Sequence, residues 1–133
     1  MGRIETDPNK RGSGKTVLVA DDNPEIRRWV SQTFLSDGFS TCGEAENGQE
    51  AIDLAKQILP DLIILDLSMP VMNGLQAAIE LRKLAPKTPI ILFTMFGSDE
   101  VNALASKLGV DLVLSKVVAL SSLLDQAHSL MSP

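Results

Sequence analysis

From Thr16 onward the sequence alternates between two hydrophobic periods, and this alternation limits the possible folds more than any other feature. Five short apolar runs are typical of strands, most of them buried on both faces: residues 16–20, 39–45, 62–65, 89–94 and 111–115. Each run is followed by a segment with apolar residues at helical spacing. Strands alternating with helices predict right-handed crossovers and a mostly parallel sheet covered on both sides. We therefore expect an α/β fold, a doubly wound five-stranded sheet of order 2-1-3-4-5 with five helices.

The helical segments carry their own start and stop signals. Asn23 followed by Pro24 is typical of a helix start, and Gly38 suits the end of that helix. Ser98 and Gly109 bracket another helix in the same way. The expected helices lie within residues 23–38, 48–59, 75–86, 98–109 and 120–131. An apolar stripe is expected on the first helix at Ile26, Trp29, Val30 and Phe34, and the third helix is marked by the helical spacing of Leu75, Ala78, Ile79 and Arg82.

Length and composition indicate one ordinary globular domain. The chain has 133 residues, of which 44% are hydrophobic and 22% are charged. A net charge of −5 without a basic stripe argues against direct nucleic-acid binding. No apolar run approaches the roughly 20 residues of a membrane span, and none follows Met1 as in a signal peptide. The single cysteine, Cys42, cannot form an internal disulfide, which suits a reducing cytoplasm. We therefore expect a cytoplasmic protein and, without an apolar span, no membrane partner.

The first fifteen residues differ from the rest of the chain. Pro8, Gly12 and Gly14 interrupt any regular element there, and few side chains could pack. We expect residues 1–15 to be a flexible N-terminal leader and residues 16–131 to form the single folded domain.

Polar residues stand at the ends of four expected strands. Asp21 and Asp22 follow the first strand, and Asp66 follows the third. Thr94 ends the fourth, and Lys116 follows the fifth. With the expected strand order, the first and third strands are neighbours, and ligands of such sheets bind beyond the carboxyl ends of these strands. The three aspartates should therefore converge in one crevice.

The chemistry of these residues points to a metal and a phosphoryl group. Three carboxylates this close repel one another unless a cation joins them, and Mg²⁺ is the hard divalent ion that suits oxygen ligands. Thr94 offers a hydroxyl and Lys116 a positive charge, which a phosphorylated carboxylate would need. Each residue also has an ordinary structural interpretation, such as a helix cap, a turn residue or an exposed lysine. Their joint position at strand ends favours a site.

Four stretches of the chain resemble a known family: "VLVADDNPEIRRWV", "DLIILDLSMPVMNGL", "PIILFT" and "DLVLSK". The paired acids, the D-x-x-M-P-x-M-N-G stretch and the later threonine and lysine are similar to the receiver domain of two-component response regulators. The resemblance covers residues 16–131. It implies the flavodoxin-like form of the expected fold and a phosphoprotein of signal transduction.

The resemblance also implies how the domain works. Asp66 would be the phosphoacceptor, taking a phosphoryl group from a phosphohistidine on a sensor histidine kinase or a histidine phosphotransfer protein of a phosphorelay. Thr94 would bond the phosphoryl oxygen, and Lys116 would neutralise its charge. Such a domain is not an enzyme, apart from self-phosphorylation by small donors and self-dephosphorylation. Its output would be a changed surface for a downstream protein target or output domain that the sequence does not identify.

A metal site is implied by the same resemblance. Asp22, Asp66 and the backbone carbonyl of Ser68 would hold Mg²⁺, and Asp21 would act through metal-bound water. Three other positions depart from the family pattern. Val113 stands where an aromatic residue is common, Met95 where a small residue follows the threonine, and Val117 where a proline follows the lysine. These departures concern the conformational switch rather than the chemistry.

Two other functions remain open at this stage. An interaction module with the same fold would make little use of phosphorylation, but such domains usually lose an acid or the lysine, and here all are present. A hydrolase of the aspartyl-phosphate type carries a second acid two residues after its nucleophile, and Ser68 stands at that position.

Overall fold

The computed structural model describes residues 12–132 and has the α/β architecture that the sequence predicts. Its parallel sheet has the order β2-β1-β3-β4-β5. The strands are β1 (Thr16–Ala20), β2 (Thr41–Ala45), β3 (Leu62–Leu65), β4 (Ile90–Thr94) and β5 (Leu112–Ser115). The helices are α1 (Pro24–Ser36), α2 (Gly48–Ile58), α3 (Gly74–Leu84), α4 (Asp99–Lys107) and α5 (Leu120–Met131).

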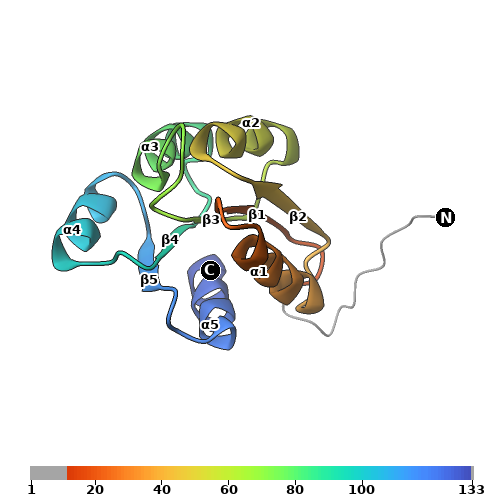
Figure 1. Ribbon diagram of the computed structural model, residues 1–133. Helices are drawn as coiled ribbons and strands as arrows, with labels where there is room; N and C mark the ends of the chain where they lie inside the picture. Colours follow the sequence, from red (N-terminus) through yellow and green to blue (C-terminus); the bar gives the residue numbers. More distant parts are fainter. Residues whose placement is uncertain (1–11, 133) are drawn as a thin grey trace.

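Helices cover both faces of the sheet and create two hydrophobic cores. Figure 1 shows α1 and α5 on one side and α2 and α3 on the other, with α4 near the β5 edge. Successive side chains of a strand point to opposite faces. Leu62 and Ile64 therefore pack with α1 and α5, whereas Ile63 and Leu65 pack with α2 and α3. This explains why β3 is apolar at every position and at most 2% exposed.

The helices begin where the capping signals indicate. The side chain of Asn23 accepts hydrogen bonds at the start of α1, and Ser98 does so at the start of α4. One expectation about the apolar stripe is wrong, because Trp29 is 62% exposed; Ile79 on α3 is 37% exposed as well. A helix lying on a sheet buries only a narrow part of its surface, and these side chains lie outside that part.

The described end of the predicted leader contacts the domain. The backbone N–H of Gly12 donates to the carbonyl of Asp37 at 3.0 Å, and that of Ser40 donates to Lys15 at 2.9 Å. A Cβ atom at Gly12 would overlap the ring of Phe39. The first eleven residues of the leader lie outside the described part of the chain.

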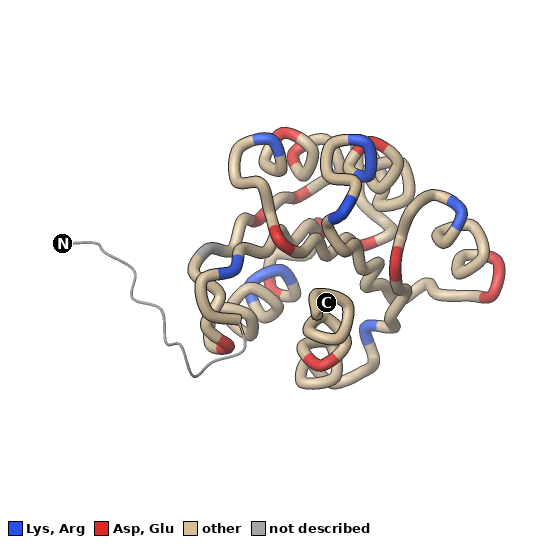
Figure 2. Tube along the Cα trace, turned by 180° about the vertical axis from the view of Figure 1, so that it is seen from behind, with Lys and Arg blue, Asp and Glu red and all other residues tan. Residues whose placement is uncertain are grey.

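Within residues 12–132, no helix has the length and apolar character needed to cross a membrane. Figure 2 shows acidic and basic residues interspersed along the helices.

Candidate functional site

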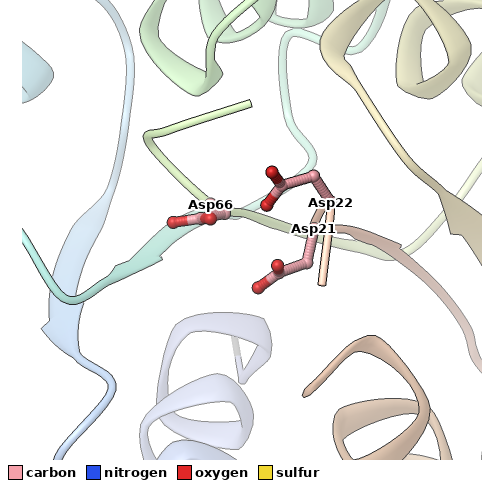
Figure 3. A group of neighbouring side chains, drawn as sticks. All are labelled: Asp21, Asp22 and Asp66. Atoms are coloured by element: carbon pink, nitrogen blue, oxygen red, sulfur yellow. The ribbon is translucent and has the colours of Figure 1, made fainter. Parts of the chain in front are cut away.

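The three aspartates come together at the carboxyl end of the sheet. Asp21 and Asp22 continue β1, and Asp66 continues the neighbouring strand β3 (Figure 3). One carboxylate oxygen from each residue lies within 4.8 Å of the others. Asp21 and Asp66 are only 3% and 6% exposed, whereas Asp22 is open to solvent. The three acids therefore converge as the strand order predicts, and their hard carboxylate oxygens fit Mg²⁺.

Lys116 contacts two of the three acids. Its Nζ lies 2.6 Å from Oδ2 of Asp21 and 3.2 Å from Oδ2 of Asp66, and its side chain is only 7% exposed. One ammonium group thus faces two buried carboxylates, with Asp22 beside them. If all three acids are ionised, the cluster carries a net charge of −2. A divalent cation would balance that charge, which supports the metal site on electrostatic grounds.

The electrostatics of Asp66 follow from its surroundings. Burial raises the pKa of Asp66 above its usual value, and the negative charge of Asp21 raises it further. Lys116 and the backbone N–H of Ser68 act in the opposite direction by stabilising the carboxylate.

Asp21 has a partner at every polar atom. Its backbone N–H donates to the carbonyl of Ala45, and its own carbonyl accepts from Arg27. One carboxylate oxygen accepts from the backbone N–H of Asn23, and the other contacts Lys116. Such complete pairing fixes both the main chain and the side chain of Asp21. Arg27 carries no motif signal in the sequence, and its part in the site was not predicted.

Glycine is required where the loop after β3 joins α3. A Cβ atom at Gly74 would overlap the carbonyl oxygen of Asp66, so only glycine allows this approach. The backbone N–H of Gly74 also donates to Leu67 at 2.9 Å. Asn73 and Gln76 then form a capping box that starts α3. The chain after Asp66 is therefore held in one path around the acid.

Val71 in this loop is strained. Its φ is +66°, and its side chain is 82% exposed, so no packing compensates for a conformation that β-branched residues avoid. Asparagine tolerates this conformation, and Val71→Asn should raise the free energy of unfolding by about 1 kcal/mol. Urea denaturation measures this change. Val117→Asn, at a similarly exposed valine without positive φ, is the control; an equal gain there would refute the strain.

Thr94 is fully buried at the end of β4. Its hydroxyl accepts a hydrogen bond of 3.1 Å from the backbone N–H of Phe96, and its carbonyl accepts one of 3.0 Å from the backbone N–H of Lys116. The hydroxyl is thus engaged within its own loop. Met95 and Phe96 are 57% and 64% exposed. A pocket beside the loop that follows Asp66 is lined by Leu67, Ser68, Met69, Asn73 and Phe96.

His128, Asp37 and Cys42 lie outside the acidic cluster and contribute to packing or to pairing between helices. The Nε2 atom of His128 lies 2.5 Å from Oδ2 of Asp37. The side chain of Asp37 is only 15% exposed because it ends α1 against α5. Cys42 packs at the edge of a core, as expected for a small apolar residue, and burial raises its pKa to about 11.

Comparison with known proteins agrees with this geometry. The family profile of the response regulator receiver domain matches residues 17–128. The chain is 38% identical over 114 residues to the nitrate/nitrite response regulator NarL of Escherichia coli, covering 85% of this chain but only 53% of NarL. It is 35% identical over 96 residues to the chemotaxis protein CheY of Thermotoga maritima, covering 72% of this chain and 80% of that protein.

The structural neighbours agree as well. The chemotaxis protein CheY4 of Vibrio cholerae superposes with a TM-score of 0.84 at 30% identity, covering 89% of this chain and 99% of CheY4. The expected family and the expected flavodoxin-like fold are both confirmed. The chain belongs to the receiver domain family of two-component response regulators and has the phosphoacceptor signalling role of that family.

Proposed function

We propose that Asp66 is the phosphoacceptor and that its donor is a phosphohistidine on a sensor histidine kinase or a histidine phosphotransfer protein. The observation that carries this proposal is the position of Asp66. Its carboxylate lies at the end of a rigid buried strand, 3.2 Å from Lys116 and within one cluster with Asp21 and Asp22. Phosphoryl transfer requires mainly alignment and neutralisation of charge, and this arrangement supplies both.

The metal of the proposed reaction is Mg²⁺. Asp22, Asp66 and the backbone carbonyl of Ser68 would hold it, and Asp21 would act through metal-bound water. The proposal is supported by three hard carboxylate donors whose oxygens lie within 4.8 Å of one another. When bound, the ion would neutralise the charge that gathers on the transferred group.

The chain's own residues would carry the remaining steps. A carboxylate oxygen of Asp66 forms a bond to phosphorus as the P–N bond to the donor histidine breaks, and the electron pair of that bond stays on the imidazole nitrogen. Lys116 then neutralises a phosphoryl oxygen in place of Asp66. Thr94 leaves the backbone N–H of Phe96 and donates its hydroxyl to another phosphoryl oxygen. The acyl phosphate is the signalling state, so the domain is a phosphorylated switch rather than a classical enzyme.

We also propose which surface of the domain changes on phosphorylation. Val113 lies opposite Leu92 in the register of β4 and β5 and packs partly against the core. It has little side chain to turn inward when Thr94 moves. We expect the shift to appear in the loop after Thr94 and at the start of α4, where Met95 and Phe96 are exposed, more than in β5.

The wider setting follows the family. We place a leader at residues 1–15 and the receiver domain at 16–131, acting in the cytoplasm without direct contact to nucleic acid or membrane. The chain spans about half the length of NarL. The downstream partner would be an output domain or a separate protein target.

Transfer from a phosphorylated histidine phosphotransfer protein tests the proposed donor. The radiolabelled phosphoryl group should leave the donor and appear on this chain in Mg²⁺, and transfer should stop in excess chelator. Retention of all label on several unrelated donors, under conditions where a known receiver accepts it, would favour the interaction module instead.

Removing Asp22 should weaken Mg²⁺ binding by at least roughly 100-fold, because loss of a group that only supports a metal ligand already costs about 10- to 100-fold and Asp22 would contact the ion itself. The physical reason is that Asp22 supplies an exposed carboxylate to the cluster. Calorimetric titration of Asp22→Ala measures the change. Asp53→Ala is the matched control, since Asp53 lies exposed on α2 and accepts a hydrogen bond from Gln49. Equal affinities for the two variants would contradict the assignment of Asp22.

A further inference from the structure

Arg27 of α1 contacts the acidic site at the main chain of Asp21 rather than at a carboxylate. Its Nη1 donates a hydrogen bond of 2.7 Å to the carbonyl oxygen of Asp21, and its side chain is only 13% exposed. The hydrogen bond joins the first turns of the helix to the loop that carries both β1 acids. A charged donor to a carbonyl forms one of the stronger hydrogen bonds available in a protein.

The other side of the guanidinium is held by β2. Its Nε lies 3.1 Å from Oε1 of Glu44, and its Nη2 lies 3.9 Å from Oε1 of Glu46. Both glutamates are on the strand or loop next to β1, so they come from the edge of the sheet. Arg27 is therefore fixed at both ends, with its charge compensated by two carboxylates.

The hydrogen bond from Arg27 to the carbonyl of Asp21 affects the orientation of Asp22 more than that of Asp21. The carbonyl of Asp21 and the N–H of Asp22 belong to one planar peptide unit, so fixing the carbonyl fixes the plane. The direction of the Cα–Cβ bond of Asp22 depends on that plane. Asp22 is the exposed member of the cluster, and its side chain has less packing around it than those of Asp21 and Asp66.

We propose that Arg27 is a positioning residue for the divalent-cation site: it holds the peptide unit between Asp21 and Asp22 so that the Asp22 carboxylate faces Asp66. The inference rests on the proposed function, because it concerns the same Mg²⁺ site. It adds a residue that touches neither the ion nor the phosphoryl group and acts only through the main chain. Glu44 and Glu46 support it by holding the guanidinium in place.

A role through charge and a role through positioning predict opposite changes in Mg²⁺ affinity when Arg27 is replaced. A cation near a metal site repels the metal, so its removal by simple electrostatics should tighten Mg²⁺ binding. Loss of positioning should weaken binding instead, by about 10-fold if Arg27 acts as supporting groups at metal sites do. The direction of the change in affinity therefore separates the two roles.

The test is a calorimetric Mg²⁺ titration of the full chain carrying Arg27→Met. Arg28→Met is the matched control, because Arg28 is the next residue of α1 and is exposed to solvent. We expect about 10-fold weaker binding for Arg27→Met and unchanged binding for Arg28→Met. Arg27→Lys, which keeps one donor but not the planar fork, should bind Mg²⁺ with intermediate affinity.

A second control variant tests whether loss of any guanidinium network weakens Mg²⁺ binding. Arg82→Ala removes another guanidinium network far from the acids, and its Mg²⁺ affinity should equal that of the unsubstituted chain. Weakening of Arg82→Ala and Arg27→Met to the same extent would overturn the proposal, as would unchanged or tighter binding by Arg27→Met. If Arg27→Met does not fold, Arg27→Lys decides by the same criterion. Absence of Mg²⁺ binding to the unsubstituted chain would instead overturn the proposed function, and this inference with it.

Discussion

Replacement of Asp66 with asparagine should abolish the Mg²⁺-dependent phosphoryl adduct. The amide preserves the size of a side chain that is only 6% exposed, so the fold should persist. It lacks the anionic oxygen that attacks phosphorus and that would bind the metal. Intact mass after incubation with Mg²⁺ and acetyl phosphate should show one phosphoryl group on the unsubstituted chain and none on Asp66→Asn.

The matched control for this change is Asp53→Asn, at an exposed acid on α2. It should accept the phosphoryl group as well as the unsubstituted chain does. An adduct on Asp66→Asn of the same yield and the same Mg²⁺ dependence would mean that another residue is the acceptor.

Arg82→Ala should lower the free energy of unfolding by about 3 kcal/mol, the scale expected when a charged hydrogen-bond donor leaves a partly buried network. The guanidinium donates to the carbonyls of Ala85, Thr88 and Gly109 at 2.6 to 3.2 Å. It also contacts Asp111 at 2.8 Å, and Asp111 in turn accepts from the backbone N–H of Ile90. Its removal therefore loosens the end of α3 and the starts of two strands together. Chemical denaturation measures the loss.

Lys83→Ala provides the comparison for Arg82→Ala. Lys83 is the next residue of α3, and it pairs with Glu80 at 3.4 Å with both side chains at least half exposed. Exposed pairs of this kind contribute at most about 1 kcal/mol. Similar losses for the two variants would show that the network of Arg82 does not stabilise the fold.

The fold was predictable because its strands carry a strong and simple signal. The run Leu62–Leu65 is apolar at every position, as a strand with helices on both faces must be. Short runs of this kind, separated by capped helices, leave few topologies once right-handed crossovers are required. The acids could be placed in one crevice for the same reason, since the strand order decides which strand ends are neighbours.

The roles of two arginines could not be predicted from the sequence. Arg82 has the helical spacing that marks α3, but its partners include the carbonyl of Gly109, 27 residues away. Arg27 binds the carbonyl of Asp21 and a glutamate of β2. Carbonyl groups are present at every residue, so no side-chain pattern indicates which of them an arginine will meet. The pairing of Asp37 with His128, 91 residues apart, has the same cause.

Other details were present in the sequence as local signals. Asn73 with Gln76 three residues later is a capping-box pattern that indicates a helix start at Gly74, one residue before the expected start at Leu75. Trp29 was placed on a buried stripe by its spacing, yet it is 62% exposed. Helical spacing defines a direction around the helix but not the width of the buried face, so residues at its margin cannot be assigned.

The most direct test of the central claim is to locate the phosphoryl group chemically. An acyl phosphate on an aspartate is reduced by borohydride to homoserine, whereas a phosphate ester on serine or threonine is not. After incubation with Mg²⁺ and a phosphodonor, followed by borohydride and peptide mass spectrometry, homoserine should replace Asp66 and no other aspartate. Homoserine at Asp21 or Asp22, or a borohydride-stable phosphate on Ser68 or Thr94 with Asp66 intact, would contradict the account.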